Sequence, residues 1–394
     1  MSVPRTTGNR FFRLAGLGLV LLLIAVPVLA LAGCGDDEPE ATTSPSAMAG
    51  SGVEEAAALV ASGESEPTFE LTEAFPEKPQ SGQTVMYISV LLGIPFSQEL
   101  VKGFKEGMTA AGNEVIVSDA NGSVQEGARL IDQAINQKVS AIVIQSISSD
   151  ALSAPIQAAK KAGIPVIELF EANPGLPTAE QEAIGVFGNV SFDFAYAGQL
   201  QAAWVVADSG GQGHGMIITA PDSGVSGTQT DAMYEVFKTM APDFEVDLSK
   251  ALQAQWATKI PQLTQAALRD PTIDYIMPIY DGMATYVTPE IAKQNAQDRV
   301  KVNAINANVP QMKQLAAGDI ITSLVGQPLN WIGWGIADQT LRATNGLPPV
   351  ADELIGQRMF TEKNIGDIDV NADQGTWFGD TDYKAAYLEL WGLN

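Results

Sequence analysis

From Thr84 onward, the chain alternates short runs of β-branched and aliphatic residues with longer amphipathic stretches. The short runs have the length and composition of buried strands, and the longer stretches repeat apolar residues at helical spacing. This order predicts a parallel sheet with helices on both faces, because parallel strands need crossover connections. Strands are expected over residues 84–90, 114–118, 140–144, 165–167, 216–219, 244–248, 273–278, 300–306 and 320–325, and helices over residues 97–111, 124–136, 151–162, 192–209, 230–240, 260–269 and 284–295.

The strand–helix rhythm restarts near residue 192, so the folded part divides into two α/β units, each with the ordinary length of a domain. The predicted fold class is therefore α/β, with two doubly wound parallel-sheet lobes. In open sheets of this kind, ligands bind beyond the carboxyl ends of the strands. The loops expected there span residues 91–98, 119–123, 145–150, 168–176, 220–228, 279–283 and 306–309.

Charge and the two rarest residue types exclude several classes of function. The 394 residues include 22 basic and 46 acidic side chains, a net charge of -24, which would repel the phosphate backbone of a nucleic acid. The single cysteine and single histidine exclude a disulfide within the monomer and a Cys/His zinc site. Ser-His-Asp catalysis would depend on His214 alone, and residues 210–213 are interpreted as a turn, not a phosphate-binding loop. No metal site, cofactor or catalytic residue is therefore predicted.

The amino terminus has the layout of an export signal, because three arginines precede an apolar run over residues 14–32. A retained transmembrane anchor is the alternative, since the run is just long enough to span a bilayer. The sequence Leu31-Ala32-Gly33-Cys34 resembles a bacterial lipobox, which implies cleavage before Cys34 and lipid attached to it. We therefore expect a signal peptide over residues 1–33 and an exported protein that is lipid-anchored to the outer face of the bacterial cytoplasmic membrane.

Residues 34–83 change abruptly in composition. The stretch from Gly35 to Gln83 holds eleven acidic residues and one lysine, with Ser, Thr, Pro, Gly and Ala making up most of the rest. Such a segment buries too little apolar surface to offset the entropy lost on ordering. Residues 34–83 are therefore expected to form a flexible acidic linker, with at most a short helix over residues 53–61.

Polar and aromatic residues dominate the loops at the predicted strand ends. Carboxylates and amides hydrogen-bond pairs of hydroxyl groups, and an aromatic face covers the apolar side of a ring. This mixture suits a polar organic ligand such as a sugar. The residues concerned are Phe96, Ser97, Asp119, Asn121, Gln145, Phe170, Glu171, Tyr280, Asp281 and Asn306.

Several short motifs occur in order along the folded part. They are Ile94-Pro95-Phe96 before a helix with Gly103-Phe104, Ser118-Asp119-Ala120-Asn121, Gly163-Ile164-Pro165-Val166-Ile167, Asp281-Gly282-Met283-Ala284, and the strand from Ile320 to Gln327. Their order and spacing, over residues 84–350, resemble the type 1 periplasmic binding proteins, and among them the ribose- and galactose-like sugar-binding components of ABC importers. The resemblance implies two lobes that are joined by three crossovers, near residues 188–189, 325–328 and 356–360, and close on a ligand by a hinge. It implies an N-terminal lobe at residues 84–188 plus 328–356 and a C-terminal lobe at residues 189–327 plus 357–394.

The resemblance also implies a ligand pocket. Carried over position by position, its residues are Phe96, Asp119, Phe170, Asn189, Trp256, Asp281, Asn306 and Gln327, to which we add the loop residues Ser97 and Tyr280. Family members that bind simple aldoses place Asp-Arg where this chain has Phe170-Glu171, and a second family arginine is missing from residues 227–231. Without these cations an anionic ligand is disfavoured, and a neutral polyol, a glycoside or an amine fits better.

Most of these candidate residues have a structural alternative. Phe96, Phe170 and Trp256 are also suited to the core, and Gln327 to the hinge backbone. Asp119 and Asp281 stand where an aspartate caps the following helix.

The leading prediction is a solute-binding lipoprotein, not an enzyme, that captures a small polar ligand and delivers it to an ABC permease. It is expected to be a monomer held at the membrane through Cys34, with no nucleic acid or cofactor bound. A receptor that reports its ligand to a signalling system, and a binding protein for an amine or aromatic solute, remain alternatives. A glycoside hydrolase with Asp119 and Asp281 as its carboxylate pair is a third, although no spacing demonstrates such a pair. A repressor of related fold is excluded, because an export signal and an acidic linker occupy the position of its DNA-binding domain.

Overall fold

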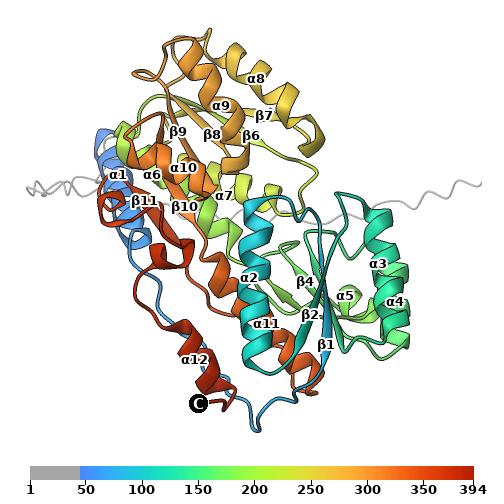
Figure 1. Cartoon of the computed structure of the whole chain (residues 1–394). Coiled ribbons are helices and arrows are strands. Elements are labelled where there is room, and N and C mark those ends of the chain that lie inside the picture. Colours follow the sequence, from blue (N-terminus) through green and yellow to red (C-terminus); the bar gives the residue numbers. More distant parts are fainter. Residues whose placement is uncertain (1–44) are drawn as a thin grey trace, which may run out of the picture. The chain divides into compact units, whose positions relative to one another are not determined.

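The computed structural model describes residues 45–394, and it contains two β-sheets with helices packed on both (Figure 1). The predicted signal peptide over residues 1–33 and the predicted lipidation site Cys34 lie outside the described residues. All strand pairs are parallel except the one at the edge of the second sheet. The predicted fold class, two α/β lobes with parallel sheets, is confirmed.

The first sheet has the strand order β2-β1-β3-β4-β5. Its strands are β1 (Thr84–Ser89), β2 (Glu114–Asp119), β3 (Ala141–Gln145), β4 (Val166–Leu169) and β5 (Val186–Val190), and its helices are α2 (Pro95–Ala110), α3 (Val124–Gln137), α4 (Ser153–Lys161), α5 (Ala179–Ile184) and α11 (Leu329–Thr344). Val85 and Tyr87 of β1 belong to the core that contains α2 and α11, whereas Met86 and Ile88 belong to the core that contains α3 and α4. A strand buried on both faces has no polar side, which is why β1 appears in the sequence as an almost continuous apolar run.

The second sheet has the strand order β11-β10-β9-β8-β6-β7, with β11 antiparallel to β10. Its strands are β6 (His214–Thr219), β7 (Glu245–Lys250), β8 (Tyr275–Pro278), β9 (Lys301–Asn306), β10 (Ile321–Gly326) and β11 (Arg358–Thr361), and its helices are α6 (Phe194–Ser209), α7 (Ser226–Met240), α8 (Trp256–Ala267), α9 (Asp281–Lys293) and α10 (Val309–Ala316). Short 3-10 turns follow at Gln253–Gln255, Ile365–Asp367 and Gln374–Phe378. Ile276 and Val302 are paired on its central strands and are fully buried, so this lobe has a core of its own.

The chain passes between the two sheets at three places. It leaves the first sheet after β5 to enter α6, returns from the end of β10 into α11, and leaves again between α11 and β11. The first two passages start at the carboxyl ends of parallel strands. They therefore lie at the edge where open α/β sheets bind their ligands.

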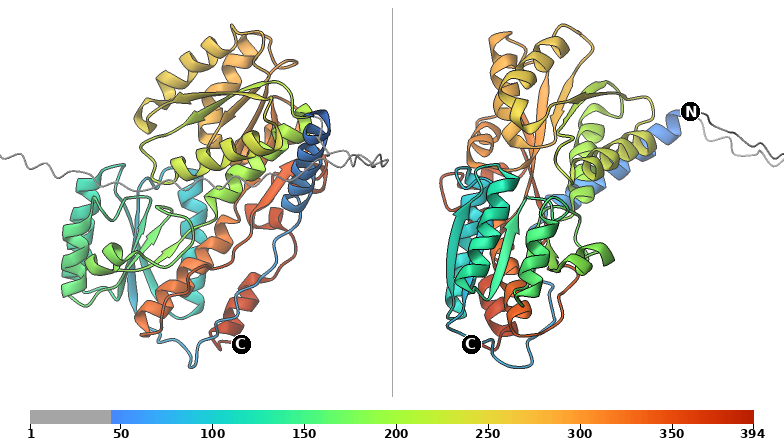
Figure 2. Two further views of the ribbon diagram at one scale, coloured as in Figure 1. Left: turned by 180° about the vertical axis from the view of Figure 1, so that it is seen from behind. Right: turned by 90° about the vertical axis from the view of Figure 1, so that its right-hand side faces the viewer.

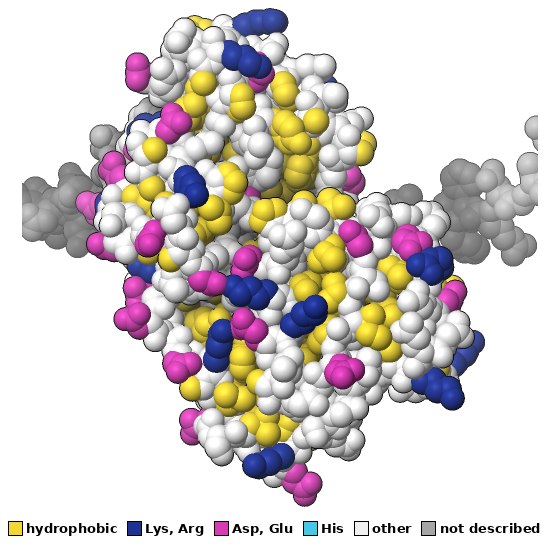
Figure 3. Space-filling view, in the orientation of Figure 1, with side chains coloured by type: hydrophobic (Ala, Val, Ile, Leu, Met, Phe, Trp, Pro, Cys, Tyr) yellow, Lys and Arg dark blue, Asp and Glu magenta, His cyan; other side chains and the backbone are white. Residues whose placement is uncertain are grey.

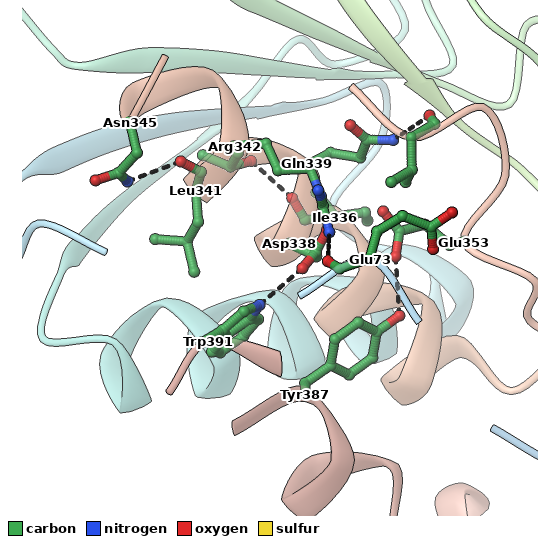
Figure 4. Close-up of polar contacts among 12 residues, drawn as sticks. Glu73, Ile336, Asp338, Gln339, Leu341, Arg342, Asn345, Glu353, Tyr387 and Trp391 are labelled. Carbon is green, nitrogen blue, oxygen red and sulfur yellow. Dashed lines mark hydrogen bonds and ion pairs between the residues drawn. The ribbon is translucent and has the colours of Figure 1, made fainter. Parts of the chain in front are cut away.

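The last segment of the chain corrects the expectation that residues 357–394 belong to the C-terminal lobe. Trp377 packs in the core of the second lobe. Tyr387 in α12 (Tyr383–Leu390) and Trp391 just after it pack instead in the core of the first lobe. Trp391 Nε1 donates to Asp338 Oδ1 of α11 at 2.7 Å (Figure 4). The sequence pattern of this segment could not show which lobe it packs on, because aromatic residues predict burial without identifying their partners.

Residues 45–83 do not form a free linker, which corrects a second expectation. Helix α1 (Pro45–Gly63) packs against α6 and α7 of the second lobe, with Ala56 and Val60 buried there (Figure 2). Farther along, Leu71 and Phe75 are buried in the core of the first lobe. A few apolar side chains are enough to order a segment when it packs on a core that the rest of the chain forms. The average composition of residues 34–83 did not reveal them.

The two terminal segments meet at α11. Arg342 forms a buried ion pair with Asp338, and it also donates to the carbonyl of Glu73 in the N-terminal segment (Figure 4). The Phe75 N–H donates to the Leu390 carbonyl at 2.8 Å, which joins the N-terminal segment directly to α12. Both ends of the described chain are therefore part of the folded protein.

The remaining differences from the sequence pattern concern short elements. Strands β5 and β11 and helices α5 and α10 are each between four and eight residues long, and none of them is among the expected elements. Such lengths contain too few repeats for a period to be recognised. Helices α11 and α12 had no expected bounds either. The remaining strands and helices of the two lobes begin and end within a few residues of their expected bounds.

Candidate functional site

A row of four phenylalanine rings lies at the carboxyl edge of the first sheet. The ring centroid of Phe96, at the start of α2, is 5.5 Å from that of Phe170, which is 5.6 Å from that of Phe192, which is 4.1 Å from that of Phe194. Phe170 follows β4 with a φ of 63°, a left-handed backbone conformation that aromatic residues rarely adopt. Phe170, Phe192 and Phe194 are buried, so Phe96 is the ring of this row that keeps exposed surface.

Ser97 is next to Phe96 in sequence but lies inside the lobe. Gln145 Nε2 donates to Ser97 Oγ at 2.8 Å, and Gln145 Oε1 accepts hydrogen bonds from Tyr87 and Ser89, each at 3.0 Å. This fully buried network fixes the end of β3 against β1 and α2. Ser97 Oγ already has a protein partner, so Ser97 stabilises the loop edge from inside the lobe.

Asp119 ends β2 and is half-buried. Its Oδ1 accepts from the Asn121 N–H at 2.8 Å, in a turn where Asn121 has a φ of 52°. The following helix, α3, is capped by Ser123, which accepts from the Glu126 N–H at 3.2 Å. The alternative interpretation of Asp119 as the helix cap is therefore wrong.

Asp281 is fully buried at the start of α9. The Asn308 N–H donates to Asp281 Oδ2 at 2.6 Å, and Asn308 Nδ2 donates to Oδ1 at 2.7 Å. Burial raises the pKa of the Asp281 carboxyl to about 6, against the lowering effect of hydrogen bonds from Asn308 and Asn306. The carboxylate thereby holds the loop after β9, where Asn306 and Ala307 have φ values of 108° and 57°. Asp281 is thus a loop-positioning residue, and Asn306 lies in the loop that it positions.

Trp256 and Tyr280 form the aromatic part of the second lobe's loop edge. Their ring centroids are 6.4 Å apart. Trp256 is half-buried at the start of α8 and donates from Nε1 to the Ala251 carbonyl at 3.3 Å. The Tyr280 hydroxyl is 3.1 Å from Ser223 Oγ in the loop between β6 and α7. Hydrogen bonds within the lobe therefore fix both rings, and each is half-buried.

Glu171 lies at a contact between the two lobes. A Cβ atom at Gly224 of the second lobe would lie 3.2 Å from Glu171 Oε2, so the backbones approach closely there. Val225, the next residue, packs in the apolar core of the first lobe together with Phe170. Burial, assisted by the negative charge of Glu168, raises the pKa of Glu171 to about 7. Glu171 therefore lies between the lobes, next to the phenylalanine row.

Two buried amides at the passages between the lobes have polar atoms without a hydrogen-bond partner among the described residues. Gln327 follows β10 and is fully buried, and neither its Nε2 nor its Oε1 has a partner among the described residues. Asn189 in β5 is buried, and its Oδ1 also lacks a partner in that part of the chain. Unpaired buried polar atoms are rare in folded proteins and costly. A ligand with hydroxyl groups would supply both the donors and the acceptors that these amides lack.

The chemistry of the site is that of hydrogen bonding and stacking. No group of three or more metal-ligating side chains occurs within residues 45–394, so these candidate residues do not assemble a metal centre. On the face seen in Figure 3, Lys and Arg side chains are scattered among Asp and Glu. That distribution differs from the continuous basic surface that nucleic-acid binding requires.

Comparison with known proteins agrees with this architecture. The profile of a family described as a periplasmic binding protein domain matches residues 85–348. A xylitol-binding protein of Mycolicibacterium smegmatis is 26% identical over 265 residues, which cover 64% of this chain and 67% of that protein. A D-xylose-binding periplasmic protein of Escherichia coli is 24% identical over 283 residues, which cover 68% of this chain and 80% of that protein.

Solved structures show the same fold. The structure of a 5-methylthioribose transporter solute binding protein from Thermotoga lettingae superimposes with a TM-score of 0.68 and 17% sequence identity, covering 81% of this chain and all of that one. A periplasmic ribose ABC transporter structure from Conexibacter woesei gives a TM-score of 0.66 and 22% identity, covering 77% of this chain and 99% of that one.

Of the ten sequence-predicted residues, Asp119, Trp256 and Asn306 lie at the loop edges with hydrogen bonds to neighbouring groups of their own lobe. The other seven divide into two groups. The first group lies at the facing edges of the lobes or at the passages between them, and it consists of Phe96, Phe170, Asn189, Tyr280 and Gln327. In the second group, Ser97 and Asp281 form hydrogen bonds with other protein groups. The predicted pocket omits Glu171, although the sequence analysis names it among the strand-end loop residues that suit a polar ligand. It stands where the resembling family places an arginine.

Proposed function

The chain belongs to the periplasmic binding protein domain family, and on that premise we propose that it captures a neutral sugar or polyol between its two lobes and delivers it to an ABC importer. The two curated relatives are named for xylitol and for D-xylose, which makes small polyhydroxylated molecules the first class to consider. Members of the family bind solutes without transforming them, so the chain is not an enzyme. The glycoside hydrolase alternative also loses its carboxylate pair, because both oxygens of Asp281 accept from Asn308.

The observation that carries this proposal is the unpartnered amide of Gln327. A hydroxyl group donates one hydrogen bond and accepts others, so a polyol satisfies the amide oxygen and the amide nitrogen with the same chemistry. The unpartnered oxygen of Asn189 calls for a hydroxyl donor of the same kind. The position after β10, at a passage between lobes, ties binding to the relative movement of the lobes.

Charge favours a neutral ligand. The candidate residues, with Glu171 added, contain three carboxylates and no lysine or arginine. A buried anion would meet Glu171 without a cation to compensate it. The aromatic surface of Phe96 on the first lobe and of Trp256 on the second suits the C–H faces of a sugar or a reduced sugar.

We also propose that the protein is exported and anchored to the membrane by lipid, as expected from the sequence. Relatives named as periplasmic or import binding proteins support an exported protein, and lipid attached to Cys34 would hold it at the outer face of the cytoplasmic membrane. The helices described within residues 45–394 include none with the length and apolarity needed to span a membrane. The proposal keeps the monomeric state, as expected from the sequence.

The direct test is calorimetric titration of the full-length protein with xylitol, D-xylose and D-ribose, with glucuronate as the anionic comparison and phenylethylamine as the amine. We expect saturable binding of at least one neutral compound and none of glucuronate. Glu171→Gln and Gln327→Met should each weaken that binding at least tenfold, because the first replaces a carboxylate acceptor by an amide donor and the second removes the polar atoms of the amide. The matched control Glu182→Gln changes an exposed carboxyl on α5 and should leave affinity unchanged.

Binding of the amine alone, weakened by Gln327→Met, would replace the sugar by an amine solute. Silence with all compounds would overturn the ligand class. Delivery is tested separately by uptake of the labelled ligand in cells with and without the gene. Uptake that is lost with the gene supports the importer, whereas unchanged uptake supports the signalling receptor.

A further inference from the structure

A cavity lies where the chain passes from β5 into α6, and Phe192 of the phenylalanine row forms part of its wall. Its volume is about 310 Å³, within the range of roughly 300–1,000 Å³ that is typical of small-molecule sites. Its walls come from the N-terminal segment, from residues 192–196, and from the segment just before β11. The wall residues before 71 and after 351 lie outside the span 85–348 that matches the family. The cavity is therefore built largely by parts of the chain that the family match does not include.

One buried polar atom of the wall has no partner. Gln357 is 8% exposed, and its Nε2 donates to the Asp193 carbonyl at 2.7 Å. That bond fixes the amide, and Oε1 is left without a hydrogen-bond donor among residues 45–394. Because Gln357 lines the cavity, a ligand N–H or O–H is the group that would satisfy this oxygen.

The wall is also acidic. Four carboxylates line it, at Glu66, Glu70, Asp193 and Asp352. Glu66 Oε1 lies 3.3 Å from Arg358 and is thereby neutralised. Burial and the negative charge of Asp193 both raise the pKa of Asp352, and the ion pairs of the described chain include neither of these two aspartates. A cation between them would relieve their mutual repulsion.

Besides the hydroxyls of Ser62, Ser65 and Thr68, the rest of the lining is mostly apolar or aromatic, which does not suit a bare metal ion as the natural occupant. Phe192 and Ile355 are buried, and Tyr196 and the 42% exposed Leu354 complete this side. The part of the chain that the structure covers has no cluster of three metal-ligating side chains. The lining thus combines a carboxylate end with an apolar and aromatic side.

From this arrangement we propose that the cavity binds a small organic cation, a protonated primary amine on a short apolar chain. The ammonium group donates to Gln357 Oε1 and to the carboxylates of Asp193 and Asp352. The apolar chain lies against Tyr196 and Ile355. The cavity borders the phenylalanine row through Phe192, but its polar residues are not among the candidate sugar-binding residues. The proposal does not depend on the identity of the transported solute.

The probe is n-butylamine, titrated into the full-length protein by calorimetry, with n-butanol as the neutral compound of the same length. We expect saturable binding of the amine and none of the alcohol, and binding of the amine should weaken at raised salt. Asp352→Asn should lower the affinity at least tenfold, and it is a safe substitution because this side chain is half-exposed. Gln357→Met should lower it similarly. The matched control Glu362→Gln, an exposed carboxyl after β11, should change it less than twofold.

Two results would overturn the proposal: no saturable binding of n-butylamine, or equal affinity in the wild type and Asp352→Asn. Failure of the sugar proposal is a distinct result. Gln327→Met should abolish sugar binding while amine binding persists, and Asp352→Asn should do the reverse. A bromine anomalous peak from 4-bromobutylamine in crystals of the protein would locate the amine, and a peak elsewhere would reject this cavity.

Discussion

Asn308 donates two hydrogen bonds to Asp281, from its backbone N–H to Oδ2 at 2.6 Å and from Nδ2 to Oδ1 at 2.7 Å. The pair joins the start of α9 to the loop after β9, and it is fully buried on the Asp281 side. Both oxygens of the carboxylate are therefore engaged within the protein. We therefore expect ligand contacts at this edge of the second lobe to come from the loop that Asp281 positions, which contains Asn306.

Replacing Asp281 with alanine should therefore act on both stability and binding. The substitution leaves two buried donors of Asn308 without an acceptor, so we expect a loss of about 1–3 kcal/mol in the free energy of unfolding. The freed loop should also weaken sugar binding through Asn306. Urea unfolding at pH 7 measures the first effect and calorimetry the second, with exposed Asp298→Ala as the control. An unchanged urea midpoint would contradict the positioning role.

Glu171 should make stability depend on pH. Burial and the charge of Glu168 raise its pKa from 4.5 to about 7, so the folded state holds this proton more tightly than the unfolded state does. The stabilisation is then fully present below pH 4.5 and is lost as the pH rises through 7, an effect on the order of 3 kcal/mol. Urea unfolding at pH 5 and pH 8 should show a smaller difference for Glu171→Gln than for the wild type. Equal differences would show that the folded state does not raise this pKa.

The same carboxyl predicts that sugar binding releases a proton. A ligand hydroxyl donates to the ionised carboxylate, so binding favours the ionised form and the affinity should rise as the pH rises through 7. Calorimetry in two buffers with different ionisation enthalpies measures the protons released. Glu171→Gln should release none, and proton uptake by the wild type would place the ligand elsewhere.

Gln327→Met should have opposite effects on stability and binding. The amide has no partner among the described residues, so an apolar side chain of similar volume should raise the stability of the ligand-free protein by about 1–3 kcal/mol. The same change removes the polar atoms offered to the ligand, so affinity should fall at least tenfold. Gln145→Met is the matched control, because Gln145 is fully bonded and its loss should destabilise the protein. A destabilised Gln327→Met would mean that this amide serves the hinge itself.

The fold of the two lobes was predictable because most of their strands and helices are bounded by local signals. Gly112 and Gly163 both have a φ of 76° and follow helices directly, as the sequence pattern of helix ends requires. The packing of α1 and α12 had no such local signal. Their few buried side chains pack on surfaces that distant segments form, so the sequence does not show their partners. Trp391, for example, bonds to Asp338, 53 residues away.

The candidate site was predictable to the extent that residue type alone decides it. Aromatic and amide residues at strand ends indicated Phe96 and Gln327, whose ligand contacts stay predictions. Ser97 and Asp281 have the right chemistry, but their partners Gln145 and Asn308 stand 48 and 27 residues away, so their engagement could not be seen. Glu171 was named only among the loop residues that suit a polar ligand, because the burial between the lobes that raises its pKa could not be seen in the sequence.

The packing of α1 can be tested at a single glycine. A Cβ at Gly52 would overlap the backbone of Met240 in α7, whereas a Cβ at Gly50, two residues earlier in the same helix, would meet nothing within 4 Å. Gly52→Val should therefore detach α1 from the second lobe, with the loss of burial of Ala56 and Val60. Gly50→Val is the matched control, because it makes the same change in helix propensity without a clash. Limited proteolysis should cleave within residues 45–63 of Gly52→Val faster than in the control, while sugar binding by the two lobes persists in both. Equal cleavage of the two variants would show that α1 does not depend on this contact.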